Sequence, residues 1–299
     1  FVVKPVDVCA CVLLTSFEEN ATTSHGICAH GESSVYLNQV NAQKLDQDLM
    51  STPGFSVDQL MELAGWNEKE DVNLGLSCAT SIAKEYETRT YENILVVCGP
   101  GNNGLGCDGS VMPRGDGLVA ARHLKHFGYS PAVFYPKRSS KGDGVRLFGN
   151  LVKQLEDMEV PFLTEFPHVD LEESIHRREQ LSTRFQLVVD AIFGFSFHGT
   201  PRAPFDTMIA SLNQTSIPIV SVDIPSGWDV ELGDVQHCGI AHPDMLISLT
   251  APKLCAKHFT GRFHYIGGRF LPPGLARKYE ISMPDYPLWE QCVRVSVVC

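Results

Sequence analysis

The chain has 299 residues, and its 35 acidic side chains outnumber 24 basic ones, for a formal net charge of −11. This length allows one large α/β domain or two small ones, and the lack of a Pro/Ser-rich linker favours one. No basic stripe with interleaved aromatic residues occurs, which argues against nucleic acid and anionic membrane as partners. No apolar stretch is long enough to span a membrane. A small-molecule site is therefore expected.

The ten cysteines are scattered and lack the paired C-x-x-C spacing of a zinc site. Several lie in apolar runs, as reduced core cysteines do, which indicates a reducing compartment. The chain begins at Phe1 without methionine, and the apolar run 8–14 is consistent with the remnant of a targeting segment. We expect a mitochondrial or cytoplasmic protein, with secretion as a further option.

The N-terminal part predicts helices after a poorly ordered extension. Residues 1–34 show no clear periodicity, so the folded domain is expected to cover 35–299. Apolar residues at helical spacing predict a helix after Asn38 and, beyond the Pro53-Gly54 break, a second helix from Ser56. The charged segment 66–75 interrupts this pattern, and helical spacing resumes over 76–86.

From Ile94 onward, apolar runs alternate with helical patterns. Strands are expected at 94–98, 131–135, 160–163, 186–192, 217–222, 244–249 and 262–266. Helices are expected at 117–127, 144–158, 170–183 and 204–214. This alternation predicts an α/β fold with a mostly parallel sheet, covered by helices on both faces.

The loop after the first of these strands, residues 99–104 (GPGNNG), is typical of an anion site beside a helix N-terminus. The next strand ends in Pro136-Lys137-Arg138 and lacks the acidic residue that would hold a ribose, which argues against an ordinary dinucleotide fingerprint. Asn102 and Asn103 either offer oxygens to a ligand or cation, or serve as turn residues. Asp116 stands where the N-cap of the following helix is expected.

Two carboxylates, Asp190 and Asp223, end apolar runs that should be neighbouring parallel strands. An unpaired carboxylate is costly in apolar surroundings. Each therefore either caps a loop or pairs with Lys253 or an arginine, or one acts as general acid/base while the other binds a ligand or cation. Oxygens of Asn103, Asp190 and Ser226 would together suit a monovalent or hard cation.

Several motifs resemble the NAD(P)HX epimerase family, also called the YjeF N-terminal domain or apolipoprotein A-I-binding protein family. They are, in chain order, GPGNNG…GDGLVAARHLKHFGY, VVDAIFGFSF, VDIPSGWDVE, LISLTAPK and GRFHYIGGRFLPP. The similarity extends from about Tyr36 to about Val293 and is closest to the animal members.

The resemblance implies a three-layer α/β/α, Rossmann-like homodimer that binds a potassium ion. It implies an isomerase that interconverts the R and S epimers of hydrated NADH and NADPH in nicotinamide nucleotide repair, with apolipoprotein A-I as a protein partner. The implied cation ligands are Asn103, Asp190 and Ser226, and Asp190, then Asp223, are the candidates for acid/base catalysis. The implied substrate contacts are Asn102, Asn103, Gly104, Gly115, Asp116, Gly194, Phe195, Ser196, Phe197, His198, Gly199, Thr200 and Asp223.

Two segments, 66–75 and 105–114, depart from the family pattern. The second separates Gly104 from Gly115, which the family carries side by side. His198 and Thr200 stand where animal members carry lysine and aspartate. A non-catalytic protein- or lipoprotein-binding module on the same fold is therefore the main alternative, and an NADP-dependent oxidoreductase is the third hypothesis.

Overall fold

A computed structural model describes residues 36–51, 74–99, 115–138, 144–167 and 181–296. The chain divides into two compact units, Phe1–Glu32 and Ser33–Cys299, and the first lies wholly outside the described residues. The expected extension over 1–34 and the expected helix from Ser56 also lie outside them, so both stay predictions.

The described residues form one eight-stranded sheet with the strand order β3-β2-β1-β4-β5-β6-β7-β8. Strands β1 to β7 pair in parallel, and β8 adds to the edge in antiparallel orientation. The strands are β1 (Asn93–Cys98), β2 (Ser130–Phe134), β3 (Phe162–Leu163), β4 (Leu187–Ala191), β5 (Ile219–Val222), β6 (Met245–Leu249), β7 (Phe263–Gly267) and β8 (Cys292–Val295).

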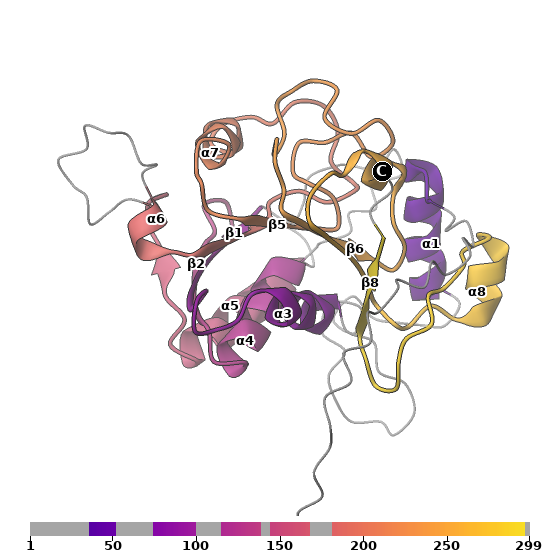
Figure 1. Cartoon of the computed structure of the whole chain (residues 1–299), viewed down its shortest axis with the longest axis horizontal. Coiled ribbons are helices and arrows are strands. Elements are labelled where there is room, and N and C mark those ends of the chain that lie inside the picture. The colour runs from indigo at the N-terminus through magenta and orange to yellow at the C-terminus, as the bar shows by residue number, and fades with distance from the viewer. Residues whose placement is uncertain (1–35, 52–73, 100–114, 139–143, 168–180, 297–299) are drawn as a thin grey trace, which may run out of the picture. The chain divides into compact units, whose positions relative to one another are not determined.

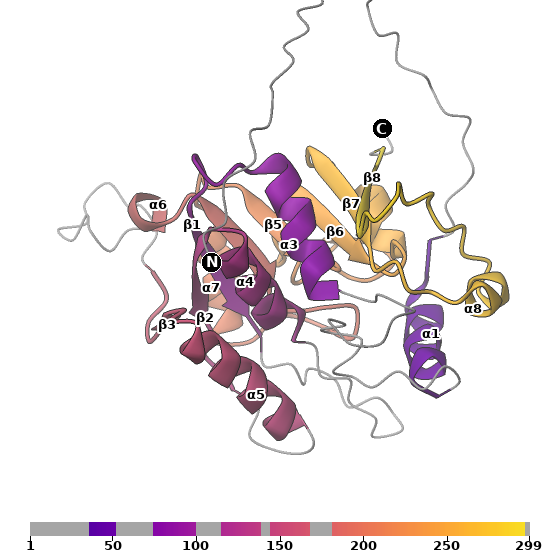
Figure 2. The same cartoon turned by 90° about the horizontal axis from the view of Figure 1, so that it is seen from below.

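Helices cover both faces of this sheet. Figures 1 and 2 show α3, α4 and α5 on one face and α7 on the other. The helices are α1 (Gln39–Ser51), α3 (Leu74–Glu85), α4 (Asp116–His126), α5 (Gly144–Asp157), α6 (Leu181–Arg184), α7 (Phe205–Leu212), α8 (Pro273–Lys278) and the 3-10 helix η2 (Leu254–His258). Among the described residues, no helix has the length and apolarity needed to cross a membrane.

Successive side chains of a strand pack on opposite faces of the sheet. In β1, Ile94 and Val96 pack in the cluster with α3, α4 and α5, whereas Leu95 and Val97 pack in the cluster with α6 and α7. Successive strand side chains point to opposite faces, so a strand buried on both faces must be apolar throughout. This explains the continuous apolar run in β1 and confirms the three-layer, Rossmann-like α/β class.

The seven strands and most helices expected from Ile94 onward are present, with bounds within about two residues of the expectation. The expected helix over 170–183 is described only as α6, because 168–180 lie outside the described residues. One expectation was wrong: Leu74 and Gly75, assigned to the interrupting segment, open α3. Gly75 faces Val119 of α4 so closely that a side chain there would clash.

The strand order places a topological switch point between β1 and β4. Strand β1 pairs with β2 on one side and β4 on the other. Helix α4, which follows β1 in the chain, lies on one face of the sheet, and α7, which follows β4, lies on the other (Figure 1). Ligands of open α/β sheets bind beyond the carboxyl ends of strands at such a point.

Candidate active site at the carboxyl ends of the strands

Four polar side chains lie at the carboxyl ends of three neighbouring strands. Asp190 is in β4 and is paired in register with Ser221 of β5. Asp223 directly follows β5, Ser226 lies in the next turn, and Lys253 follows β6. The structure therefore brings Asp190, Asp223 and Ser226 to one edge of the sheet, as the sequence predicted.

Asp190 is fully buried and accepts hydrogen bonds on both carboxylate oxygens. Its Oδ1 accepts from the Ser226 hydroxyl at 2.5 Å and from the Ile192 N–H at 3.4 Å. Its Oδ2 accepts from the Ser226 N–H and the Ser221 hydroxyl, both at 2.9 Å. Burial raises the pKa of Asp190, although these hydrogen bonds oppose the shift.

All four of these donors are uncharged. Among the side chains that the structure describes, no lysine, arginine or histidine forms an ion pair with Asp190. A buried carboxylate without a cationic partner either takes up a proton or needs a positive charge from elsewhere. An ionised Asp190 would therefore need a positive charge that none of its described neighbours supplies.

Asp223 has a different environment, because it forms a buried ion pair. Lys253 Nζ donates to Asp223 Oδ1 at 2.5 Å and to the Leu249 carbonyl at 2.8 Å. The Phe195 N–H donates to Asp223 Oδ2 at 3.1 Å. The sequence left open whether a lysine or an arginine pairs with Asp223, and it did not place Lys253 among the site residues. The run LISLTAPK, which places Lys253 just beyond the end of β6, is the sequence feature that could have identified this partner of Asp223.

The backbone that follows β4 contacts the site at Phe193 and Phe195. The Phe193 N–H donates to the Ser226 hydroxyl at 2.9 Å, and Phe195, next but one, contacts Asp223. The Phe193 and Phe197 rings stack with centroids 4.0 Å apart. Further along, His198 is exposed and lies 2.8 Å from Gln39 Nε2 at the start of α1. Gly194 and Ser196 are half-buried, and Gly199 and Thr200 are exposed.

The first turn of α4 lies at the same edge. A Cβ atom on Gly117 would approach Ala191 Cβ to 2.5 Å and Cys98 Sγ to 3.0 Å, so this turn sits directly on the ends of β1 and β4. Gly115 and Asp116 are both buried. Asp116 is the first helical residue, and Gly115 is the N-cap without a side-chain cap. The expectation that Asp116 is the N-cap was therefore wrong, although a carboxylate in a first helical turn still interacts favourably with the helix dipole.

Three expected site residues, Asn102, Asn103 and Gly104, lie outside the described residues. Of the expected cation ligands, only Asp190 and Ser226 are described. Both present oxygen atoms, which suit a hard or alkali cation better than zinc or copper. No group of three or more His, Cys, Asp or Glu that could hold a metal occurs in the described part of the chain. The oxygen atoms of Asp190 and Ser226 suit an alkali cation such as potassium. The buried Asp190 carboxylate, which has no cationic side-chain partner among the described residues, fits the same kind of ion.

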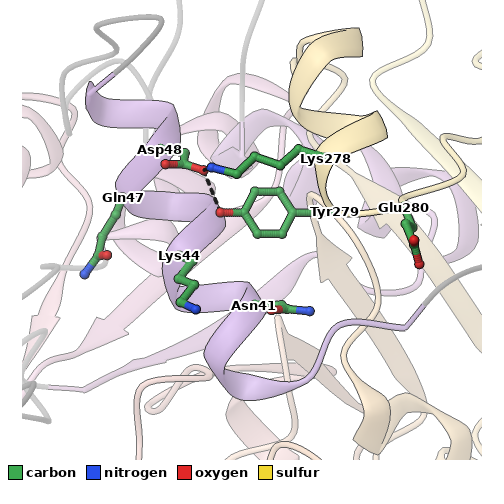
Figure 3. Close-up of a pocket in the computed structure, with 7 residues that line it drawn as sticks. All are labelled: Asn41, Lys44, Gln47, Asp48, Lys278, Tyr279 and Glu280. Carbon is green, nitrogen blue, oxygen red and sulfur yellow. Dashed lines mark hydrogen bonds and ion pairs between the residues drawn. The ribbon is translucent and has the colours of Figure 1, made fainter.

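A separate polar cavity of about 400 Å³ lies between α1 and α8. In Figure 3, Lys278 and Tyr279 both reach Asp48 of α1, at 2.5 Å and 2.6 Å. The lining residues are Asn41, Lys44, Gln47, Asp48, Lys278, Tyr279 and Glu280. None of the expected site residues is among them, so this cavity is distinct from the candidate active site.

Residues 72–255 match the model of the family described as YjeF-related protein N-terminus. The chain is 49% identical over 271 residues to Pyridoxine/pyridoxamine 5'-phosphate oxidase 1, chloroplastic, of Arabidopsis thaliana. This match covers 87% of the chain but 44% of that plant protein, so the chain spans less than half of its length. The oxidase name describes that whole protein.

A solved structure, yeast ynu0 (YNL200c), resembles the chain with a TM-score of 0.69 and 36% identity. The match covers 87% of this chain and all of the yeast chain. Closer similarity to animal members stays a prediction. The family match over more than half of the residues, together with the fold and the buried carboxylates at the strand ends, shows that the chain belongs to the YjeF N-terminal family, the NAD(P)HX epimerase family.

Proposed function

We propose that this protein interconverts the R and S epimers of hydrated NADH and NADPH at the carboxyl ends of β4, β5 and β6. The observation that carries the proposal is the pair of buried carboxylates at the switch point. Asp190 meets uncharged donors and Asp223 meets Lys253. Titratable groups in contrasting environments at one site are typical of divided catalytic roles. The nicotinamide nucleotide would then be the substrate and not a redox cofactor.

The chemistry requires one proton to move in each direction. A protonated group donates to the C6 hydroxyl, which leaves as water, and the ring nitrogen lone pair stabilises the iminium. Water then adds to the opposite face and returns a proton to the carboxylate. The reaction consumes no net proton and no electron. The fold supplies the groups that donate, accept and orient.

The two carboxylates divide this work in the proposal. Asp190 and Ser226, which are hydrogen-bonded to each other, would hold a potassium ion together with the expected ligand Asn103. A bound potassium ion would supply a fixed positive charge beside the substrate. A carboxylate that ligates a cation stays ionised, which makes it a poor proton donor. Proton transfer is therefore assigned to Asp223, and the initial preference for Asp190 gives way to its role as a ligand.

The substrate would lie between the two connections that leave the switch point. The expected contacts 194–200 follow β4, and Gly115–Asp116 lie at the start of α4, which follows β1, so both sets belong to the two strands that flank the switch point. A homodimer, apolipoprotein A-I as a partner, and a mitochondrial or cytoplasmic location belong to the same proposal at the level of family resemblance. Light scattering of the purified chain and fractionation of expressing cells would test the first and last of these.

An epimerisation assay tests the function. The purified 299-residue chain is mixed with the R epimer of hydrated NADPH in potassium buffer, and the S epimer is separated chromatographically. The proposal predicts conversion faster than the spontaneous rate, and slower conversion when lithium replaces potassium. Conversion at the spontaneous rate in potassium would contradict it.

A non-catalytic binding module is the second candidate, and the segment 105–114 is the observation that favours it. Ten extra residues cost about 1 kcal/mol or less in loop entropy, so folding alone does not exclude them. Gly115 and Asp116, which directly follow this segment, still lie at the edge of the sheet that carries Asp190. If the intact chain is inactive and deletion of 105–114 restores conversion, the binding module is the better account of this chain.

A further inference from the structure

We propose that Gln39, the first residue of α1, is a positioning residue that holds the segment 194–200 in one conformation for contact with the substrate. This inference rests on the proposed function, in which that segment contacts the substrate. Gln39 precedes the stretch 72–255 that the family model matches, and it is not among the expected site residues. The basis of the inference is a set of hydrogen bonds that join α1 to the backbone after β4.

The side-chain amide of Gln39 reaches two acceptors in this segment. Its Nε2 donates to the Phe195 carbonyl oxygen at 3.2 Å, and it lies 2.8 Å from Nε2 and 3.1 Å from Nδ1 of His198. A carbonyl oxygen only accepts hydrogen bonds, so the amide nitrogen is the atom that must face it. A primary amide carries two hydrogens, one for the carbonyl and one for an imidazole nitrogen. One side chain therefore uses both of its donors on the same segment.

The segment forms a turn that its own sequence does not fix. The Phe197 N–H donates to the Gly194 carbonyl at 3.0 Å and closes the turn, while the Phe195 N–H donates to Asp223 Oδ2 at 3.1 Å. Beyond the turn, Gly199 has φ +81°, and none of the described residues lies within 4 Å of its Cβ position. Glycine loses more conformational freedom on ordering than any other residue. The order of this segment therefore depends on contacts from outside it.

Gln39 is a fixed point because the chain next to it is tied to the connection after β6. The Leu37 N–H donates to the Pro252 carbonyl at 2.9 Å, and the Leu254 N–H donates to the Leu37 carbonyl at 3.0 Å. Leu37 is 2% exposed and packs in the same apolar cluster as Phe195. The start of α1 is thus anchored at one strand end, and the Gln39 side chain reaches the backbone that follows another.

The first test measures hydrogen exchange by mass spectrometry in the 299-residue chain, for wild type, Gln39→Met and Gln43→Met. Methionine keeps the length of the glutamine side chain and removes both donors. Peptides that cover 194–200 should exchange about tenfold faster in Gln39→Met, the effect of losing two ordinary hydrogen bonds, and peptides that cover β5 should not change. Gln43→Met makes the same change one turn further along α1 and should leave both rates at the wild-type value. Unchanged exchange over 194–200 in Gln39→Met would overturn the inference.

The second test uses kinetics to separate positioning from a merely structural role. Gln39→Met should raise KM about tenfold and keep kcat within about threefold of wild type, because only molecules with an ordered segment bind the substrate well. Its melting temperature should stay within about 2 °C of wild type, since Gln39 is only half-buried. Gln43→Met should match wild type in all three. A wild-type KM in Gln39→Met, or a fall in kcat and melting temperature without a change in KM, would contradict the role of Gln39.

The exchange measurement keeps this inference distinct from the proposed function. If the wild type does not epimerise, the proposed function fails, and the exchange rates still decide whether Gln39 holds the segment. If Gln39→Met does not fold, Gln39→Glu replaces it in both tests. A glutamate in the first turn of a helix is favourable, and at neutral pH its carboxylate has no hydrogen to donate to the Phe195 carbonyl. Wild-type exchange over 194–200 or a wild-type KM in Gln39→Glu would then overturn the inference.

Discussion

Asp190 is a fully buried carboxylate, and its interactions account for the local structure of the turn 223–226. Four donors converge on it, three of them from Ser221 and Ser226. The Ser226 hydroxyl donates to Asp190 and also accepts from the Phe193 N–H. One serine in the turn after β5 therefore links Asp190 of β4 to the backbone that follows β4. A buried network of this kind is costly when any member is removed.

Replacing Ser226 by alanine should expose this cost. The change removes a 2.5 Å hydrogen bond to Asp190 and leaves the buried Phe193 N–H without its hydroxyl acceptor. We expect a loss of about 1–3 kcal/mol in the free energy of unfolding, measured by urea denaturation. Ser216→Ala, at an exposed serine, is the control and should lie within about 0.5 kcal/mol of wild type. Equal stability of the two variants would contradict this role of Ser226.

For these single residues, the sequence predicted that the two carboxylates and the serine lie close together. It did not predict their hydrogen-bond and ion-pair partners. Asp190, Asp223 and Ser226 follow or end apolar runs, and the ends of parallel strands necessarily lie together. The pairing of Asp223 with Lys253 depends on positive φ angles at Asp223 and Thr250, which neither residue type demands. That Lys253 and not an arginine pairs with Asp223 is therefore evident only from the structure.

Among the elements, α4 shows how helix packing shapes the site. Its first turn lies on the ends of β1 and β4 because Gly117 has no side chain there. Gly117→Ala should therefore destabilise the protein by about 1–3 kcal/mol through overpacking, even though alanine is the better helix former. Gly149→Ala on α5 is the matched control. Nothing lies within 4 Å of its Cβ position, so it should stabilise by about 0.5–1 kcal/mol.

Thermal and urea unfolding of these two glycine variants gives the comparison directly. The same Gly→Ala change is expected to lower the free energy of unfolding on α4 and to raise it on α5. If Gly117→Ala were as stable as Gly149→Ala, the close contact of α4 with the strand ends would be wrong.

The elements that the sequence missed are short. The periodic segments from Ile94 to Leu249 were predicted because a buried strand or an amphipathic helix imposes its own pattern. In contrast, η2 and α8 have five and six residues, and β8 has four with only Cys292 buried. Strand β8 forms because it pairs with the edge of β7, which is a tertiary interaction and leaves little mark on local sequence.

For the whole molecule, one buried histidine is expected to make stability fall in acid. Burial lowers the pKa of His264 from its ordinary 6.5 to about 4, and its Nε2 lies 2.9 Å from the Ser248 hydroxyl. Between these pH values the unfolded chain binds more protons than the folded chain. The stabilisation from the neutral imidazole is therefore complete above about pH 6.5 and is lost as pH falls toward 4, by about 3 kcal/mol in total.

His264→Gln removes this titration and keeps an amide next to Ser248. Urea unfolding between pH 4 and 7 should show a shallower loss of stability in the variant than in wild type. Asp190 contributes with the opposite sign, because its pKa is raised, so the folded chain binds more protons there. That contribution is common to both proteins and cancels in the difference. Parallel curves would show that His264 does not titrate in this way.

The arrangement of the whole sheet supports the central claim, that a buried carboxylate at the end of β4 is essential for epimerisation. Seven parallel strands direct their carboxyl ends to one edge, and the switch point between β1 and β4 lies beside Asp190. Asp229, in the same turn region, is exposed and caps the N–H groups of Glu231 and Leu232. Asp229→Asn, only a few residues beyond Ser226, is therefore a matched control for Asp190→Asn.

The most direct measurement is the rate of R-to-S conversion of hydrated NADPH in potassium buffer by wild type, Asp190→Asn and Asp229→Asn. We expect wild type and Asp229→Asn to convert at similar rates well above the spontaneous one. Asp190→Asn should be slower by on the order of 100-fold or more, because it loses a fixed charge at the site. Equal rates for the two variants, or a wild type no faster than the spontaneous reaction, would contradict the account.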